Sequence, residues 1–181
     1  MTMRHLILAT AMLSMVTVRA QDSSWVHVSY PAYDCSWQMP GAPTMLDTLG
    51  VRMYSLELDS SMAIAVHFIQ DVLPDTTLGS LYQAAFDVEG DTLRAMAQVM
   101  LAVSYGELLA IADTVVNGVP SLDLSFAVQE QEDAEPQLLH ARLYYWNRRF
   151  ITFSVTAPYR YGTEAALMAE DLRNTIQISA P

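Results

Sequence analysis

A run of predicted antiparallel strands between Asp113 and Pro158 constrains the fold more than any other part of the sequence. Large apolar residues alternate with small or polar ones over 122–129, which is the period of two expected for a strand. Before it, the apolar run 108–116 ends at Asn117-Gly118, a turn signal because both residues tolerate positive φ. The acidic stretch 129–136 is too charged to bury and is expected to be a loop.

The other two of these three strands, Leu139–Trp146 and Arg149–Ala157, form the tightest predicted hairpin, which turns at Asn147-Arg148. A two-residue turn fixes the register of the pairing. It gives the pairs Trp146–Arg149, Tyr145–Phe150, Tyr144–Ile151 and Arg142–Phe153. Both faces of this hairpin carry apolar side chains, whereas a sheet with one face in water alternates more cleanly. We therefore expect both faces of the sheet to be covered.

The rest of the chain adds strands before this region and helices on both sides of it. Strands are predicted over 25–30, 35–39, 51–58, 61–69 and 176–179, and helices over 78–88, 92–103 and 164–174. Asp91 and Thr163 are the expected N-caps of the last two helices. This order predicts the α+β class, with one antiparallel sheet of about six to seven strands between helices. Residues 21–181 are expected to form this α/β/α sandwich as a single domain.

Residues 1–20 have the layout of a secretory signal peptide that is cleaved during export. Arg4 precedes an apolar run over 6–16, and Val18-Arg19-Ala20 offers a cleavage site before Gln21. An N-terminal anchor helix that stays in place is the alternative, although the apolar run is short for a membrane span. The expected product is an exported, soluble, periplasmic or extracellular protein without a transmembrane segment.

The composition of the remaining chain argues against two classes of partner. It has no lysine, and its seven arginines and 20 acidic residues give a formal charge of −13. Nucleic acids and anionic membranes bind basic surfaces, so neither is an expected partner. Cys35 is the only cysteine, which excludes an internal disulfide. Its place between Tyr33 and Trp37 favours a buried thiol over an intermolecular one.

No spacing of residues in the sequence predicts catalysis or a bound cofactor. His27, His67 and His140 fall on separate predicted strands, and no serine stands in a Gly-x-Ser-x-Gly motif. His67 is expected to be a core residue rather than a catalytic base. The acidic residues match no calcium loop, and the few glycines form no phosphate-binding loop. No metal and no cofactor are therefore expected, and a hydrolase is the least favoured function.

Four short motifs resemble those of small exported bacterial domains of unknown function. They are Cys35-Ser-Trp-Gln-Met-Pro-Gly-Ala-Pro43, Gly50-Val-Arg-Met-Tyr54, Val116-Asn-Gly-Val-Pro-Ser-Leu-Asp123 and Asn147-Arg-Arg-Phe-Ile-Thr-Phe-Ser-Val155. The resemblance implies the Mog1/PsbP-like fold, an antiparallel sheet sandwiched between helices. It also implies a binding or assembly factor without catalytic residues. Ser121 departs from the pattern, because these domains usually have a glycine there.

Aromatic and basic residues near the predicted hairpin are the candidate partner-binding site. They are Tyr144, Trp146, Arg148, Arg149, Tyr159, Arg160 and Tyr161. Tyrosine, tryptophan and arginine are the residues enriched at binding hot spots. The predicted function is a non-catalytic exported domain that binds a protein or a cell-envelope component. Two alternatives stay open: these residues only pack and solubilise the hairpin, or the protein carries a small apolar ligand near Met96 and Met100.

Overall fold

The computed structural model describes residues 25–48, 51–58, 62–70, 77–87, 91–129, 135–146 and 148–178. The predicted signal peptide, residues 1–20, lies outside these ranges, as do residues 130–134 of the predicted acidic loop. Within these ranges no helix is both long enough and apolar enough to span a membrane.

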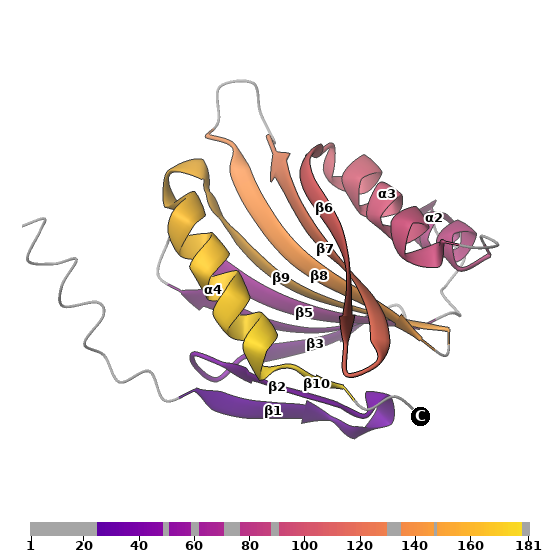
Figure 1. Cartoon of the computed structure of the whole chain (residues 1–181), viewed down its shortest axis with the longest axis horizontal. Helices are drawn as coiled ribbons and strands as arrows, with labels where there is room; N and C mark the ends of the chain where they lie inside the picture. The colour runs from indigo at the N-terminus through magenta and orange to yellow at the C-terminus, as the bar shows by residue number, and fades with distance from the viewer. Residues whose placement is uncertain are drawn as a thin grey trace, which may run out of the picture.

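Seven antiparallel strands form the main sheet, in the order β3-β4-β5-β9-β8-β7-β6 (Figure 1). Their bounds are β3 Thr44–Thr48, β4 Val51–Leu58, β5 Met62–Gln70, β6 Glu107–Val116, β7 Val119–Val128, β8 Gln137–Trp146 and β9 Arg149–Pro158. The strands β6 to β9 are consecutive along the chain. The meander therefore has four strands rather than three, because the apolar run before Asn117 is itself a strand. The prediction also missed β3, which follows the Pro40–Pro43 turn.

The turn chemistry fixes the β6–β7 turn and the β8–β9 register as predicted. Asn117 and Gly118 have φ values of 52° and 81°, the positive values that a two-residue hairpin turn of the primed type requires. In the second hairpin Trp146 lies opposite Arg149 and Tyr144 lies opposite Ile151. The predicted register of β8 and β9 is therefore confirmed.

Both faces of the main sheet are covered, as the hairpin pattern predicted. The helices α2 Thr77–Phe86 and α3 Thr92–Ser104 cover one face, where Phe126, Leu143 and Phe150 lie in the core. On the other face α4 Gly162–Thr175 packs with Ala165, Ala169 and Leu172 turned inward. The α+β class and the seven-stranded antiparallel sheet between helices are confirmed.

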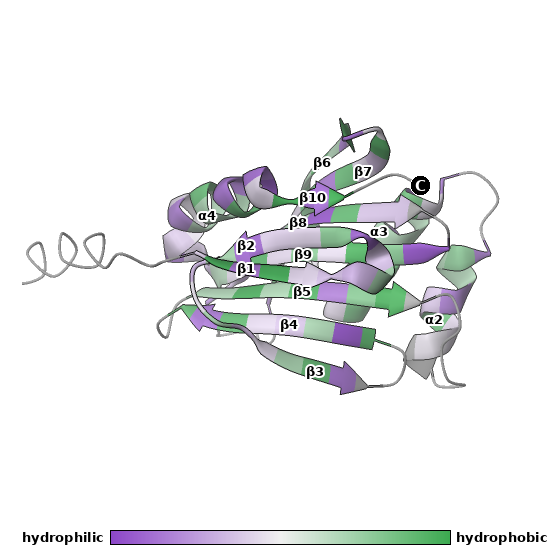
Figure 2. Ribbon diagram, turned by 90° about the horizontal axis from the view of Figure 1, so that it is seen from below, coloured by the Kyte–Doolittle hydropathy of each residue, from purple (hydrophilic) through white to green (hydrophobic). Residues whose placement is uncertain are grey.

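A second sheet shares that other face with α4, and the sequence pattern does not distinguish its strands from those of the main sheet. It has the order β1-β2-β10, with β1 Val26–Tyr30, β2 Cys35–Met39 and β10 Gln177–Ile178. Figure 2 shows β1 and β2 lying over the main sheet. The indole ring of Trp37, fully buried, has its centroid 5.5 Å from that of Phe68 on β5 and 5.7 Å from that of Phe153 on β9. The expectation that all strands join one sheet is wrong.

Local features of the helices agree with the predictions in part. Asp91 caps α3, where its carboxylate accepts a hydrogen bond from the backbone N–H of Arg94 at 3.0 Å. Thr163 does not cap α4, because a 3-10 turn, η2 Tyr159–Tyr161, leads directly into the helix at Gly162. In α2, Leu81 is exposed, whereas Ala85 and Phe86 are buried.

Candidate functional site

The seven predicted partner-binding residues lie toward opposite ends of β9. Tyr144, Trp146, Arg148 and Arg149 lie in or near the β8–β9 turn, whereas Tyr159–Tyr161 follows the far end of β9 as η2. Nine residues of β9 lie between Arg149 and Tyr159, which corresponds to about 30 Å of extended strand. Figure 1 shows the turn and η2 at opposite sides of the sheet. The two groups therefore do not share one contact surface.

At the hairpin end, two of these residues make structural contacts. The Tyr144 side chain is fully buried in the core, and this burial raises its pKa to about 12. The Arg149 guanidinium donates a hydrogen bond to the carbonyl oxygen of Ala32 at 2.7 Å and lies 4.8 Å from the centre of the Tyr33 ring. Through these two contacts Arg149 holds the β8–β9 hairpin against the 3-10 turn η1 Pro31–Tyr33. The backbone of Trp146 pairs with that of Arg149, and the structure does not describe the position of the Trp146 side chain.

The remaining predicted residues are more accessible. Arg148 is exposed, and its Nη2 lies 3.9 Å from Asp87 Oδ1. In η2, Arg160 forms an ion pair with Glu135 at 2.8 Å and stands over the Tyr161 ring. Tyr159 is 62% exposed. Exposed side chains thus occur in both groups, which lie on different parts of the surface.

A polar cleft between α4 and the strands β7 and β8 is the strongest candidate site that the structure describes. It has a volume of about 520 Å³. Its lining comprises Ser125, His140, Arg142, Ala166, Glu170, Arg173 and Asn174. Alternation along β7 and β8 turns the first three toward α4. The helix residues lie three and four apart, so they form one stripe beside the buried face of α4.

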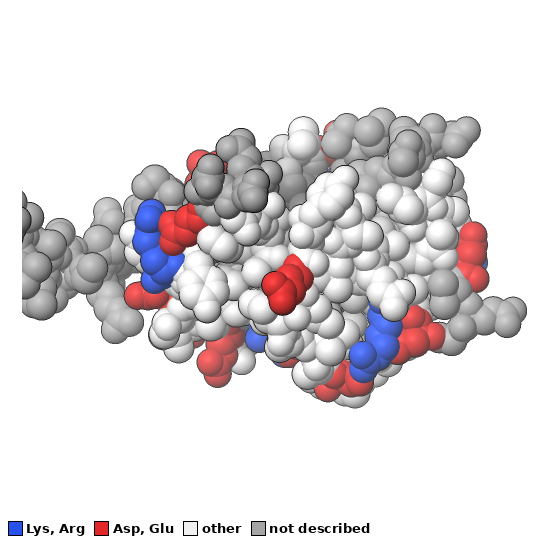
Figure 3. Space-filling view, turned by 90° about the horizontal axis from the view of Figure 1, so that it is seen from above, with Lys and Arg blue, Asp and Glu red and all other residues white. Residues whose placement is uncertain are grey.

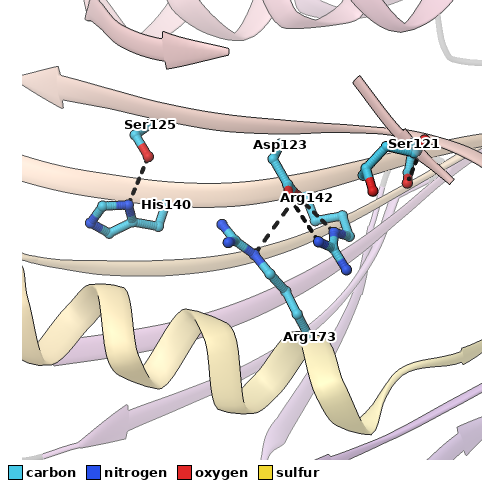
Figure 4. Close-up of polar contacts among 7 residues, drawn as sticks. Ser121, Asp123, Ser125, His140, Arg142 and Arg173 are labelled. Atoms are coloured by element: carbon cyan, nitrogen blue, oxygen red, sulfur yellow. Dashed lines mark hydrogen bonds and ion pairs between the residues drawn. The ribbon is translucent and has the colours of Figure 1, made fainter. Parts of the chain in front are cut away.

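An ion-pair network forms one end of the cleft (Figure 4). Asp123 and Arg142 are opposite each other on β7 and β8, and the carboxylate accepts hydrogen bonds from Arg142 Nε at 2.7 Å and from Nη2 at 2.8 Å. Both side chains are less than one quarter exposed, at 24% and 15%. A two-point contact of this kind holds the guanidinium plane in a fixed orientation.

Arg173 brings a second cation to the same carboxylate from α4. Its Nε lies 3.8 Å from Asp123 Oδ1, which is much farther than the Arg142 contact. Burial lowers the pKa of Arg173, the Asp123 carboxylate opposes this effect, and the nearby Arg142 reinforces it. Glu170, which also lines the cleft, opposes the effect of burial to a smaller extent. Neither carboxylate lies within hydrogen-bond distance of the Arg173 guanidinium, so an anionic group placed beside it would form the closer charge-assisted contact.

The other end of the cleft contains a serine and a histidine in contact. Ser125 Oγ and His140 Nδ1 are 2.8 Å apart, on opposite positions of β7 and β8. The His140 Nε2 atom is buried and has no hydrogen-bond partner among the described residues. Burial, and then the charge of Arg173, lower the pKa of His140, so the ring is neutral at neutral pH. This pair was not predicted, because the three histidines fall on separate predicted strands and no serine stands in a Gly-x-Ser-x-Gly motif.

Most residues of the cleft could not be predicted from the sequence, because the register that brings them together depends on a long connection. The two-residue turn fixes β8 against β9, but a long acidic connection leaves the register of β7 against β8 open. The pairs Asp123–Arg142 and Ser125–His140 depend on that register. Their only signal in the sequence is that alternate positions of both strands are polar.

Among the described residues no group of three or more histidine, cysteine, aspartate or glutamate side chains is placed to hold a metal ion.

The fold is similar to that of cyanobacterial PsbP (CyanoP) from Synechocystis sp. PCC 6803. The TM-score is 0.60 at 13% sequence identity, and the similarity covers 88% of this chain and 95% of that one. The chain has a PsbP-like fold. The Mog1/PsbP-like fold predicted from the short motifs is thereby confirmed, and at this identity the similarity establishes the fold alone.

Two further solved structures resemble this PsbP-like domain at lower TM-scores. PA94 of Pseudomonas aeruginosa, a protein of unknown function, gives 0.44 at 10% identity and covers 87% of this chain and 98% of its own. LpqN of Mycobacterium tuberculosis, which is involved in cell envelope biogenesis, gives 0.42 at 8% identity and covers 87% of this chain and 91% of its own. No protein-family model and no curated protein sequence matches the chain.

Proposed function

We propose that this protein is a non-catalytic, exported binding domain, and that an anionic group of a protein or cell-envelope partner enters the cleft between α4 and the strands β7 and β8. The observation that carries the proposal is the position of Arg173, which lines the cleft partly buried and, within the part of the chain that the structure describes, comes no closer than 3.8 Å to a carboxylate oxygen. A carboxylate or phosphate next to the guanidinium would form the charge-assisted hydrogen bonds that Asp123 makes chiefly with Arg142. Asn174 and Ser125 offer neutral hydrogen-bonding groups around the same space.

The Ser125–His140 pair raises the alternative of a hydrolase, and its electrostatics argue against it. A serine nucleophile needs a histidine whose protonated form is stabilised by an acid on its second ring nitrogen. Here Arg173 lowers the pKa of His140 and so disfavours the protonated ring. The second nitrogen, Nε2, has no acidic partner among the described residues. We therefore assign the pair to binding rather than to bond cleavage.

Site-specific photocrosslinking tests the binding site. A photoreactive phenylalanine analogue is introduced at Ala166, which lines the cleft, or at Leu167, which is 49% exposed and does not line it. Irradiation of cells that export the protein should give a discrete adduct from position 166, and Arg173→Gln should abolish that adduct. An equal adduct from position 167, or an adduct unaffected by Arg173→Gln, would contradict the proposed site.

Enzyme assays test the absence of catalysis directly. The purified protein and its Ser125→Ala variant are compared on activated ester and phosphoester substrates. The expected result is no turnover that depends on Ser125. A rate that falls at least tenfold in the Ser125→Ala variant would establish a hydrolase and overturn the proposal.

A carrier of a small apolar ligand is the second candidate, as the methionines of α3 suggested. Met96 is fully buried in the core between α3 and the main sheet, and Met100 packs against the same cluster. These positions favour a packing role for both side chains. Native mass spectrometry of the purified protein discriminates the two functions, because a carrier would retain a bound lipid or other apolar molecule.

Export itself is part of the proposal and has its own measurement. If residues 1–20 are a cleaved signal peptide, the protein recovered from outside the cytoplasm begins at Gln21. Intact-mass analysis distinguishes this product from the full chain. Recovery of the full-length chain from the membrane fraction would indicate the anchor alternative.

A further inference from the structure

The cleft between α4 and the strands β7 and β8 contains a carboxylate as well as its arginines. Among the described residues that line it, Glu170 is the only acidic one. Glu170 is exposed, and its carboxylate forms no hydrogen bond or ion pair with another described residue. A carboxylate at this place repels a ligand that carries only negative charge. Its presence therefore limits the class of anion that the cleft can hold.

Glu170 and Arg173 have the spacing of an ion pair within a helix. Asp91 and Arg94 of α3 have the same order and spacing of acid and arginine, and they are in contact at 2.9 Å. Figure 3 shows arginine side chains, in blue, beside acidic ones, in red, on one side of the surface. Residues three apart on a helix are neighbours, so a similar contact between Glu170 and Arg173 is expected. Within the described chain these two side chains do not form it.

The Arg173 side chain reaches toward the sheet instead (Figure 4). Its Nε lies 3.8 Å from Asp123 Oδ1, and the side chain is 21% exposed. The Asp123 carboxylate already has its two-point contact with Arg142. The cleft is thus left with an inner positive group, Arg173, and an outer negative group, Glu170. Their Cβ atoms, one helical turn apart on the same stripe of α4, are separated by about 5–6 Å.

We propose that the cleft binds a zwitterion, with the anionic group of the ligand at Arg173 and an ammonium group of the same ligand at Glu170. This inference rests on the proposed function, because it assigns the anionic group that enters the cleft to a ligand that also carries a positive charge. Each charge of the ligand then meets an opposite charge of the protein through a charge-assisted hydrogen bond. Amino acids and the phosphoethanolamine group of a lipid have this chemistry.

The charge of the whole chain also favours a zwitterion over a simple anion. The formal charge is −11 at pH 7, so a ligand with net negative charge approaches against a repulsive field. A ligand without net charge avoids this repulsion. The volume of the cleft, about 520 Å³, lies within the range of small-molecule sites. Ser125 and Asn174 offer further hydrogen-bonding groups to the remainder of the ligand.

Two matched pairs of compounds test the role of the ammonium group. β-Alanine differs from propionate, and phosphoethanolamine differs from ethyl phosphate, chiefly by that group. Calorimetric titration of the purified protein at low salt should give a dissociation constant at least fivefold lower for the zwitterion in at least one pair. The pair that binds more tightly identifies the anion as a carboxylate or a phosphate. Equal constants within both pairs, or no measurable binding of either zwitterion, would overturn the proposal.

Substitution of Glu170 separates this inference from the proposed function. Glu170→Gln should weaken binding of the zwitterion at least fivefold and strengthen binding of the matching anion, because it removes an attraction from one and a repulsion from the other. Asp171→Asn, at the next exposed position of α4 and outside the cleft lining, removes the same charge and should leave both constants unchanged. Arg173→Gln should weaken binding of both compounds.

The two proposals fail in different ways. If Glu170→Gln strengthens binding of both compounds, the zwitterion inference is wrong and the anion site stands. If Arg173→Gln changes neither constant, both are wrong. Vesicles of phosphatidylcholine with and without phosphatidylethanolamine identify the source, because the choline nitrogen has no N–H to donate to Glu170. Cosedimentation that requires phosphatidylethanolamine indicates a lipid headgroup, whereas binding of phosphoethanolamine without cosedimentation indicates a soluble ligand.

Discussion

At the residue scale, the buried polar and titratable side chains have two different roles. Cys35 and Tyr144 are buried in the core, and His67 is half-buried on β5. Burial shifts the pKa of each in the direction that favours its neutral form. His140, Arg142 and Arg173 instead line the cleft, where each lies near another charged or polar group. The first group affects folding alone, whereas the second affects folding and would also contact the proposed anionic group. The predictions for single residues follow from this division.

The thiol of Cys35 should be unreactive in the folded protein. It is 4% exposed, and burial raises its pKa to about 12, so almost no thiolate forms at neutral pH. Iodoacetamide should leave the native protein unmodified and alkylate it once after denaturation, as measured by mass spectrometry. Rapid alkylation of the native protein would instead support the intermolecular role of this cysteine. The buried position of Cys35, which its place between Tyr33 and Trp37 predicted, is confirmed by its low exposure.

Acid should destabilise the protein through His67 and His140. Burial lowers the pKa of both histidines below the ordinary value of 6.5, and the charge of Arg173 adds to this effect at His140. As the pH falls, these histidines are therefore protonated in the unfolded chain before they are protonated in the folded protein. Their contribution to stability is therefore complete above pH 6.5 and is lost as the pH falls below it. Each histidine adds at most about 1.4 kcal/mol per pH unit to the slope.

Urea unfolding of variants measures that slope between pH 7.5 and pH 5.5, an interval chosen to span about one unit on either side of the ordinary histidine pKa. The free energy of unfolding should fall less steeply with acid in the His67→Gln/His140→Gln double variant than in the wild type. His27→Gln, at an exposed position of β1, is the matched control and should keep the wild-type slope. Identical slopes for the wild type and the double variant would contradict the assignment.

At the scale of elements, local chemistry determined some pairings and left others open. The two-residue turn at Arg148 predicts the β8–β9 register, and Asn117-Gly118 predicts the β6–β7 turn, because each depends only on adjacent residues. The β7–β8 register depends on a longer connection, so the facing pairs of the cleft could not be read from the sequence. The placement of β2 could not be predicted either. Its alternation puts Cys35, Trp37 and Met39 on one face, but that pattern is the same in either sheet.

The N-cap of α3 is an element whose contribution can be measured. Asp91 accepts the backbone N–H of Arg94, and its side chain also pairs with the Arg94 guanidinium at 2.9 Å. Asp91→Ala removes both contacts and should lower the free energy of unfolding by about 1 kcal/mol. Asp91→Asn keeps a capping oxygen but loses the charge, so it should cost only a few tenths of a kcal/mol. Equal losses in the two variants would show that the exposed ion pair, rather than the cap, stabilises this end of the helix.

At the scale of the whole molecule, the small sheet and the main sheet share one core. Trp37 of β2 packs against Tyr54, Phe68 and Phe153, which come from three strands of the main sheet. The end of α4 continues into β10, and Thr175 there accepts a hydrogen bond from the backbone N–H of Gln38 at 3.0 Å. The first and last described elements therefore meet in one layer. This arrangement explains why the chain is expected to unfold as one domain, although it contains two sheets.

The substitution Trp37→Ala tests this unity. The substitution removes the indole ring that packs between the two sheets. Removal of a large buried aromatic side chain lowers the free energy of unfolding by about 3–5 kcal/mol. If the sheets form one cooperative unit, urea unfolding monitored by far-ultraviolet circular dichroism and by tryptophan fluorescence should give coincident transitions in the wild type. In the Trp37→Ala variant both transitions should shift together to lower urea. Gln38→Ala, at the neighbouring exposed position of β2, is the matched control and should stay within about 0.5 kcal/mol of the wild type.

Separate transitions, with the fluorescence change at lower urea, would mean that β1, β2 and β10 detach before the seven-stranded sheet unfolds. The single-domain prediction for residues 21–181 would then be wrong.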